Sequence, residues 1–553
     1  MKSGKKINQP KSETTCLKYI LAGAFLFHIS VLWGNFTWDD SILFLEAKTY
    51  SCGTDFSRVF TKPFYFNVNY FRPIISALYY FESCIYGTVP FFYKLLNLIL
   101  FTAASGLVFQ FFNALTEPLK DRKRWIPIGA ASVWIIHPIQ SELISQATNR
   151  FDLLMIVFSV LILLNSLKNG RRQYVLSFSL SFISILTKET AVIFPVLILF
   201  FALHRQNSFQ VSKAVFLHPA LSAAGILAAL SLRPLLMGYV WKSGGMPIEP
   251  GDFISHILLT ARTAVTDLRI LLLFKLNGPI HYSELPVLMN PFSISELVLF
   301  SASAAFSIFI AFRKPEIGTL LACFWVSLLP VLQIYPIELS GNSITAERYL
   351  ALPFFLLLSA GVKWAIYNEN ILINIFFRTG FIIFLSAEAV VGQYMHAVWN
   401  SSESLWNHSL WTAPKSKIPY LSLALIYAAE NRHEKAAETA DMAVSLYPPT
   451  SRRDSWDTSI LYFNRANSLM RLKRFQAAEA SYWKSIELSE NLHMQNNRAY
   501  INLSICLLVL GRREESHYIL KKLASENPGN REIQNAVRFI YENEEKSVGE
   551  FRN

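Results

Sequence analysis

The stretch "FFYKLLNLILFTAASGLVFQFFN", residues 91–113, carries a single charged side chain, Lys94. A helix of this length rises about 35 Å, more than the roughly 30 Å of hydrocarbon in a bilayer. Similar apolar runs fill the first 399 residues, so we predict an all-α, polytopic membrane bundle. The eleven predicted spans lie at 17–36, 91–113, 126–141, 151–167, 174–187, 190–204, 214–233, 293–312, 317–335, 348–367 and 372–396.

Composition separates the chain into two parts. Over all 553 residues, 52% are hydrophobic and 16% are charged, and the mean hydropathy is +0.31. From residue 400 onward, charged residues recur at helical spacing. We therefore predict a membrane domain over residues 1–399 and a second domain over residues 400–545.

The charge of the first part indicates its topology. Of the net charge of +12, the first 399 residues carry +10, mostly in loops between apolar runs. The basic loops 116–124, 168–173, 204–213 and 312–316 would be cytoplasmic by the positive-inside rule, and this explains the charge better than nucleic-acid binding does. The opposite loops hold the acids Asp39, Asp40, Glu46, Asp55, Glu142, Glu189, Glu338 and Glu347. An odd number of spans then leaves the C-terminal part outside.

Two further features concern the predicted outer side. The interrupted apolar segments 74–87 and 254–274 suit helices that lie along the membrane interface. Cys52 and Cys84 share one predicted outer loop, so they form either a disulfide or two small apolar fillers. The five cysteines show no metal-binding spacing, and no glycine-rich phosphate loop or zinc motif is found. We therefore expect no metal and no cofactor.

The C-terminal part is repetitive. Three stretches that begin at residues 420, 462 and 500 align, and each reads as a helix, a polar break and a second helix. Ala436, Ala478 and Ser516 are equivalent positions, 42 and 38 residues apart. With insertions, this fits the tetratricopeptide period of about 34 and predicts an α-solenoid. A helical bundle without repeats is the alternative.

Several charged residues fall together on the predicted outer side. Asp39 and Asp40 follow the first span directly, where a carboxylate can accept a proton from an attacking hydroxyl. Cations at the lipid–water boundary suit an anionic phosphate group. A network of structural ion pairs would explain the same residues without any catalysis. The remaining members of the set are Arg72, Glu142, Arg150, Lys188, Glu189, Glu347 and Arg348.

Six stretches, in order along the chain, resemble the transmembrane and tetratricopeptide-repeat O-mannosyltransferase-like family of the GT-C glycosyltransferase superfamily. They are "TWDDSILF", "YFRPIISALYYFESCIYGTVPFFYKLLNLILF", "IIHPIQSELISQATNRFDLLMIVF", "LTKETAVIFPVLILF", "AERYLALP" and "VWNSSESLWNHSLWTAPKS". The resemblance implies an inverting membrane enzyme that moves a mannose-like sugar from a polyprenyl-phosphate carrier to a hydroxyl acceptor, such as a protein Ser or Thr. It also implies that the repeats bind the acceptor protein or glycan.

The resemblance assigns roles to the charged residues. One of Asp39 and Asp40 would be the catalytic base. Four cations would surround the carrier phosphate, and three glutamates would orient them or the acceptor; they are Arg72, Arg150, Lys188 and Arg348, with Glu142, Glu189 and Glu347.

Alternatives to this function and location remain open from the sequence. A ligase for lipid-linked glycans, a non-catalytic anchor for a repeat scaffold, and a transporter are the three rival functions. We expect a bacterial inner membrane or, as the alternative, the endoplasmic reticulum, with periplasmic or luminal repeats and no nucleic-acid partner.

Overall fold

The computed structural model describes residues 11–46, 50–64, 70–116, 125–204, 214–238, 253–273, 278–282, 290–334, 343–368, 375–449 and 452–542. Within these ranges the chain is helical, with one isolated β-bridge between Tyr282 and Ser343 and no strand. The prediction of an all-α protein is therefore confirmed. The basic loops 116–124 and 204–213, apart from their first residues, and Glu338 lie outside the described residues.

The chain forms two compact units. Unit 1 comprises Met1–Pro279, Leu285–Glu338 and Thr345–Ser402, and unit 2 comprises Ile280–Glu284, Leu339–Ile344 and Glu403–Asn553. The helical segments of unit 1 are α1 (Lys11–His28), η1 (Ile29–Trp33), the π-helical turn η2 (Ser41–Glu46), α2 (Arg58–Thr61), α3 (Pro73–Tyr86), α4 (Pro90–Thr116), α5 (Trp125–Ile136), α6 (Ile139–Ser145), η4 (Ala147–Asn149), α7 (Arg150–Ser166), α8 (Arg171–Ile185), η5 (Glu189–Ile193), α9 (Phe194–His204), α10 (Ala214–Met237), α11 (Phe253–Leu272), α12 (Pro291–Arg313), α13 (Pro315–Leu328), η6 (Leu329–Val331), η8 (Glu347–Leu350), α14 (Ala351–Tyr367) and α16 (Ile375–Val398).

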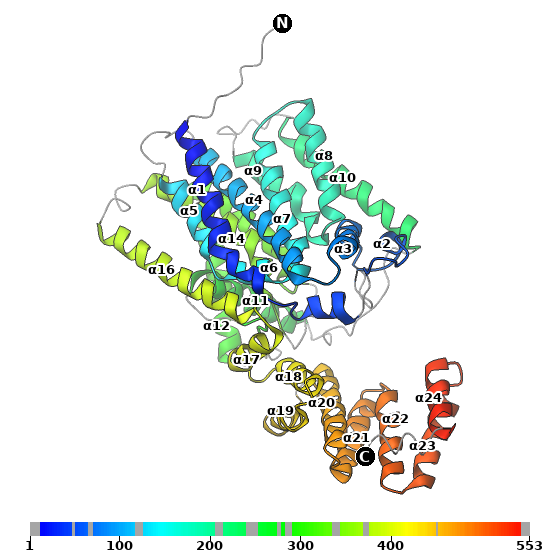
Figure 1. Cartoon of the computed structure of the whole chain (residues 1–553). Helices are drawn as coiled ribbons and strands as arrows, with labels where there is room; N and C mark the ends of the chain where they lie inside the picture. The colour runs from blue at the N-terminus through cyan, green and yellow to red at the C-terminus, as the bar shows by residue number, and fades with distance from the viewer. Residues whose placement is uncertain are drawn as a thin grey trace. The chain divides into compact units, whose positions relative to one another are not determined.

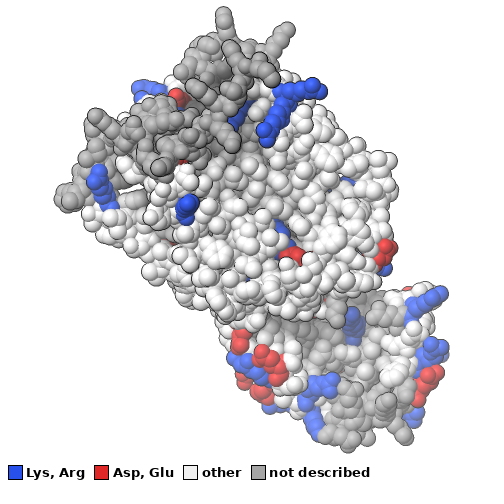
Figure 2. Space-filling model, turned by 45° about the horizontal axis from the view of Figure 1, so that its top comes forward, with Lys and Arg blue, Asp and Glu red and all other residues white. Residues whose placement is uncertain are grey.

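Unit 1 is a helical membrane bundle built around α4, which packs against α1, α5, α7 and α14 (Figure 1). Among the described residues, seven helical segments are long and apolar enough to cross a bilayer. They are Glu13–Trp33, Pro90–Thr116, Ala147–Ser166, Val215–Met237, Pro291–Arg313, Glu347–Tyr367 and Arg378–Val398. Figure 2 shows a broad face of unit 1 that is almost free of charged side chains, as contact with lipid requires.

The count of eleven spans is not confirmed. The other four predicted spans coincide with shorter helical segments, namely Trp125–Ile136, Arg171–Ile185, Glu189–Leu203 and Pro315–Val331. At 1.5 Å per residue, such segments reach only about 18–26 Å, less than the hydrocarbon thickness. Apolar composition alone does not show whether a short helix crosses the bilayer or ends inside the protein.

The short helix α6 and the turn η4 that follows it lie inside the protein. Every residue from Ile139 to Asn149, in α6 and η4, is buried. This segment packs against α4, α7, α16 and η8. Polar side chains here satisfy backbone groups: Asn97 Nδ2 donates to the Gln146 carbonyl at 2.9 Å, and Gln140 Nε2 donates to the Trp134 carbonyl at 2.9 Å.

The predicted outer loop contains the disulfide Cys52–Cys84, while Cys16, Cys323 and Cys506 are free thiols. We expect three cysteines to react with a maleimide after denaturation without reductant, and all five after reduction. Mass spectrometry of the labelled protein measures this count. Five labelled cysteines before reduction would show that the bridge does not form in the cell, and would remove the argument for an oxidising compartment.

Unit 2 contains paired helices in the predicted phase. Its helices are α17 (Ser402–Thr412), α18 (Lys417–Ala429), α19 (His433–Leu446), α20 (Arg452–Arg471), α21 (Phe475–Asn491), α22 (Asn497–Val509), α23 (Arg513–Glu526) and α24 (Arg531–Glu542). The three predicted hairpins are α18–α19, α20–α21 and α22–α23. Their equivalent small residues, Ala436, Ala478 and Ser516, are buried near the start of each second helix.

The three hairpins share one turn geometry, which explains their common phase. Two residues after each first helix comes a residue of positive φ, namely Asn431, Lys473 or Gly511. The N–H of the following arginine then bonds back to a helix carbonyl five residues earlier, as in a Schellman motif. This turn reverses the chain, so that the small residue four positions into the second helix packs against the first.

Candidate active site

The adjacent acids Asp39 and Asp40 lie in the turn between η1 and η2, and they have different surroundings. Asp40 is fully buried, and its two carboxylate oxygens accept the backbone N–H groups of Ala147 at 2.9 Å and Thr148 at 2.7 Å. Burial raises the pKa of Asp40 to about 6, against the opposing effects of these hydrogen bonds and of nearby Lys94. Asp40 therefore ties the turn to η4.

Asp39 is only partly buried. Its carboxylate lies near enough to Arg348 and Tyr70 to act electrostatically on both. The preceding residue, Trp38, has a positive φ of 49° and stacks on Trp399, with 6.4 Å between ring centroids. This fixed turn directs the two carboxylates to different neighbours, and Asp39 is the one of the pair that solvent can reach. We call the end of unit 1 formed by residues 34–40, η4 and η8 the site face.

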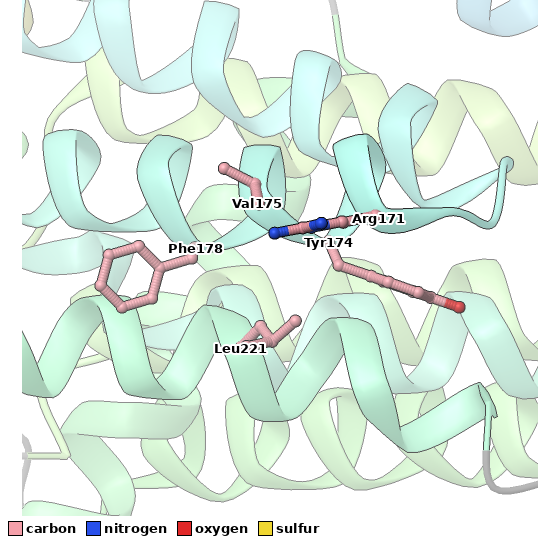
Figure 3. Close-up of a pocket in the computed structure, with 5 residues that line it drawn as sticks. All are labelled: Arg171, Tyr174, Val175, Phe178 and Leu221. Atoms are coloured by element: carbon pink, nitrogen blue, oxygen red, sulfur yellow. The ribbon is translucent and has the colours of Figure 1, made fainter.

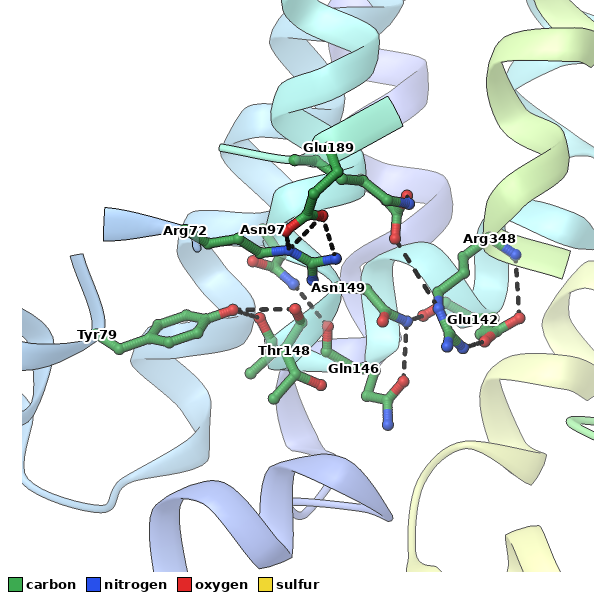
Figure 4. Close-up of polar contacts among 12 residues, drawn as sticks. Arg72, Tyr79, Asn97, Glu142, Gln146, Thr148, Asn149, Glu189 and Arg348 are labelled. Carbon is green, nitrogen blue, oxygen red and sulfur yellow. Dashed lines mark hydrogen bonds and ion pairs between the residues drawn. The ribbon is translucent and has the colours of Figure 1, made fainter. Parts of the chain in front are cut away.

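Arg348 is held at the site face by Glu142 of the buried helix α6 (Figure 4). The Arg348 backbone N–H donates to Glu142 Oε2 at 3.1 Å, and the guanidinium forms an ion pair with the same carboxylate. Burial raises the pKa of Glu142, and the Arg348 charge opposes this shift. One carboxylate thus fixes both the backbone and the side chain at the start of η8.

Lys188 and Arg348 approach a second buried acid, Asp152. The Lys188 ammonium forms an ion pair with Asp152 Oδ1, and Arg348 Nε lies 3.9 Å from Asp152 Oδ2. The Lys188 ammonium is also 4.7 Å from the centre of the Tyr349 ring. Two cations from distant parts of the chain therefore share one carboxylate and one aromatic ring.

Arg72 is the third cation of this group. Its guanidinium carbon lies 4.3 Å from the ring centres of both Tyr70 and Phe151, and its edge pairs with Glu189 at 2.8 Å. Lys188 lies near enough to Arg72 for their charges to interact. We call Arg72, Lys188 and Arg348 the cation cluster.

Arg150, although predicted to join this group, is placed elsewhere. Its side chain is fully buried, and its three nitrogens meet Asn97 Oδ1 at 3.0 Å, the Glu82 carboxylate and the Tyr93 carbonyl at 3.0 Å. The guanidinium therefore joins α3, α4 and α7. All three of its nitrogens have protein partners, so Arg150 links these helices.

The predicted glutamates also differ in their surroundings. Glu142 is 1% exposed and Glu189 is 35% exposed, so only the second keeps substantial contact with water. Glu347 is buried near Glu142, close enough for the two carboxyl groups to repel each other. Glu142 and Glu189 thus hold cations in place, whereas Glu347 is a buried acid near Glu142.

Three residues that contact the cation cluster were not among the predicted site residues: Asp152, Tyr70 and Tyr349. Each is adjacent or nearly adjacent to a predicted cation, in "NRFD", "NYFR" and "ERYL". A search for aromatic or acidic residues within two positions of each cation would have found all three. Among the described residues, no group of three or more His, Cys, Asp or Glu side chains could hold a metal ion.

Comparison with known proteins concerns the repeats and the family resemblance of the chain. A tetratricopeptide-repeat family model matches residues 460–492, which cover most of the α20–α21 hairpin. The chain is 25% identical over 226 residues to the protein O-mannosyl-transferase Tmtc2 of Drosophila melanogaster, an alignment that covers 38% of this chain and 24% of that relative. It is also 25% identical over 160 residues to the protein O-mannosyl-transferase F38B6.6 of Caenorhabditis elegans, covering 28% of this chain and 23% of that relative.

These alignments span about a quarter of each relative's length. They confirm the resemblance that the six sequence stretches predict.

Proposed function

We propose, starting from the similarity of this chain to transmembrane and tetratricopeptide-repeat protein O-mannosyltransferases, that it is an inverting membrane glycosyltransferase. It would transfer a mannose-like sugar from a polyprenyl-phosphate carrier to a hydroxyl acceptor, with a protein Ser or Thr as the favoured acceptor. The observation that carries this proposal is partly exposed Asp39 within electrostatic range of Arg348, a member of the cation cluster, at the end of a membrane bundle.

Asp39 is the proposed base. Its carboxylate takes the proton of the acceptor hydroxyl while the acceptor oxygen bonds to the anomeric carbon of the sugar. The bond between that carbon and the phosphate oxygen breaks, and its electron pair leaves on the phosphate. Attack opposite the leaving group inverts the anomeric configuration in one step.

The cation cluster is the proposed site of the carrier phosphate. Negative charge grows on the phosphate as the bond breaks, and fixed positive groups stabilise this charge in the transition state. The paired carboxylates hold Arg348 and Lys188 in place before the donor binds. Because Glu189 keeps contact with water, its pair with Arg72 is the one that a phosphate displaces at the lowest desolvation cost.

The remaining parts support the site without touching the reacting atoms. Asp40 and Arg150 fix the turn and the helices around it. The repeats of unit 2 would bind the acceptor, since stacked helical hairpins offer an extended surface to a polypeptide. The predicted loop charges and the Cys52–Cys84 disulfide favour a non-cytoplasmic location for the site face.

The proposal is tested with purified protein in detergent or liposomes, a radiolabelled polyprenyl-phosphate mannose and a Ser/Thr-rich acceptor peptide. We expect labelled peptide to accumulate with time and with the opposite anomeric configuration to the donor. Glucose- and galactose-bearing donors test the sugar, and a lipid-linked oligosaccharide tests the ligase alternative. Transfer from none of these donors, in a sample that still melts cooperatively, would favour the scaffold alternative.

A further inference from the structure

We propose that the groove between α1 and α16 holds the first isoprene units of the carrier, and this inference rests on the proposed function. The groove has a volume of about 550 Å³. Its apolar walls are Leu26, Phe27 and Ile29 on one side and Ala389 and Val390 on the other. Both helices belong to spans that are only 28% buried within unit 1, so the groove opens toward lipid.

The groove reaches the site face through direct contacts. Gly392 of α16 accepts a hydrogen bond from Ser141 Oγ at 3.2 Å, and the next residue of α6, Glu142, holds Arg348. The groove residue Gln393 directly follows Gly392. Helix α16 therefore both lines the groove and contacts the helix that holds Arg348 of the cation cluster.

Along η1, which supplies Ile29 and Ser30 to its lining, the groove also leads toward the turn that carries Asp39. Ser30, at its end, is separated from this turn by the rest of η1, whose residues rise about 2 Å each. Beyond η1, Asn35 N–H donates to the Asn400 carbonyl at 2.8 Å, which joins the segments that follow the two helices. A lipid chain that leaves the groove at this end would lead toward the turn that carries Asp39.

Polar groups at this end of the groove favour a lipid whose polar head is near. Buried His28 and His396 bond to each other at 2.9 Å, and His396 bonds to Ser30 Oγ at 3.2 Å. Gln393 Nε2 donates to the Phe27 carbonyl. The groove lining is therefore apolar at Leu26 and Phe27 and polar at Ser30 and Gln393. This order suits a polyprenyl phosphate, which has an apolar chain and a polar head.

A second pocket supplies a matched control. It has a volume of about 350 Å³ and lies between α8 and α10, lined by Arg171, Tyr174, Val175, Phe178 and Leu221 (Figure 3). Helix α7 begins at the site face with Arg150 and rises about 25 Å before α8 begins at Arg171. This pocket is also open to lipid, but it is remote from Asp39.

The experiment compares Val390→Trp with Val175→Trp, both at exposed positions. Each variant is assayed with undecaprenyl-phosphate mannose and with the short-chain citronellyl-phosphate mannose. We expect Val390→Trp to raise the KM for the long-chain donor about tenfold, because the indole displaces isoprene groups from the apolar walls. The KM for the short-chain donor should change less than about twofold, and Val175→Trp should change neither.

Equal behaviour of the two variants would overturn the groove assignment while leaving the proposed function intact. A second measurement does not need sugar transfer: a diazirine-bearing undecaprenyl phosphate is cross-linked to the wild-type protein. We expect labelled peptides from residues 26–30 and 389–393, and their loss in Val390→Trp. Labelling that excess phospholipid abolishes would show that a membrane phospholipid fills the groove instead.

Discussion

Replacing Asp39 by Asn is expected to lower the rate of sugar transfer by roughly a hundredfold or more, the contribution of a positioned general base. The amide keeps the size of the side chain but cannot take the acceptor proton. The KM for the donor should change little, because the phosphate is held by the cation cluster. Initial-rate kinetics in a reconstituted membrane assay measure both parameters.

Asp40→Asn is the matched comparison, since it makes the same change one residue away. Asn has one oxygen, so one of the buried N–H groups of Ala147 and Thr148 loses its acceptor. We expect this variant to lose stability by about 1–3 kcal/mol in a thermal melt. Asp39→Asn should melt like the wild type. Normal transfer rates in both variants would remove the catalytic role of this pair.

Arg348→Ala is expected to act mainly on donor binding. A hydrogen bond between charged groups contributes about 1.5–3 kcal/mol, so the KM for the donor should rise about 10- to 100-fold. The rate at saturating donor should fall less than in Asp39→Asn. Arg348→Lys keeps the charge and should retain part of the affinity.

The Arg348→Ala variant also affects Glu142, the buried partner of Arg348. Loss of the guanidinium leaves Glu142 buried without its cation, which is destabilising. The double variant Arg348→Ala/Glu142→Gln removes both charges and separates binding from folding. The single variant Glu142→Gln keeps Arg348 and should show a smaller rise in KM. If the double variant binds donor with unchanged affinity, Arg348 does not hold the phosphate.

Much of the candidate site was visible in the sequence because its residues are charges next to apolar runs. A charged group at the end of a span needs a partner or a ligand, so Arg72, Lys188 and Arg348 could be selected without a structure. The same criterion selected Arg150, whose guanidinium is fully buried and bonded to three helical partners. The criterion detects the cost of a buried charge, but it does not show which group offsets that cost.

The sequence by itself determined the helical membrane bundle and the phase of the repeats. Long apolar runs must form helices in lipid, since no water is there to bond the backbone, and small residues at fixed offsets let paired helices approach. Only the tertiary structure decided how short apolar segments such as α6 are used, and that Asp40 turns inward while Asp39 stays accessible. The physical reason is distance along the chain: Asp40 is fixed by N–H groups more than a hundred residues away, and Arg348 by a carboxylate about two hundred residues away. Local sequence patterns specify helices and apolar faces, whereas such long-range hydrogen bonds exist only once the helices have packed.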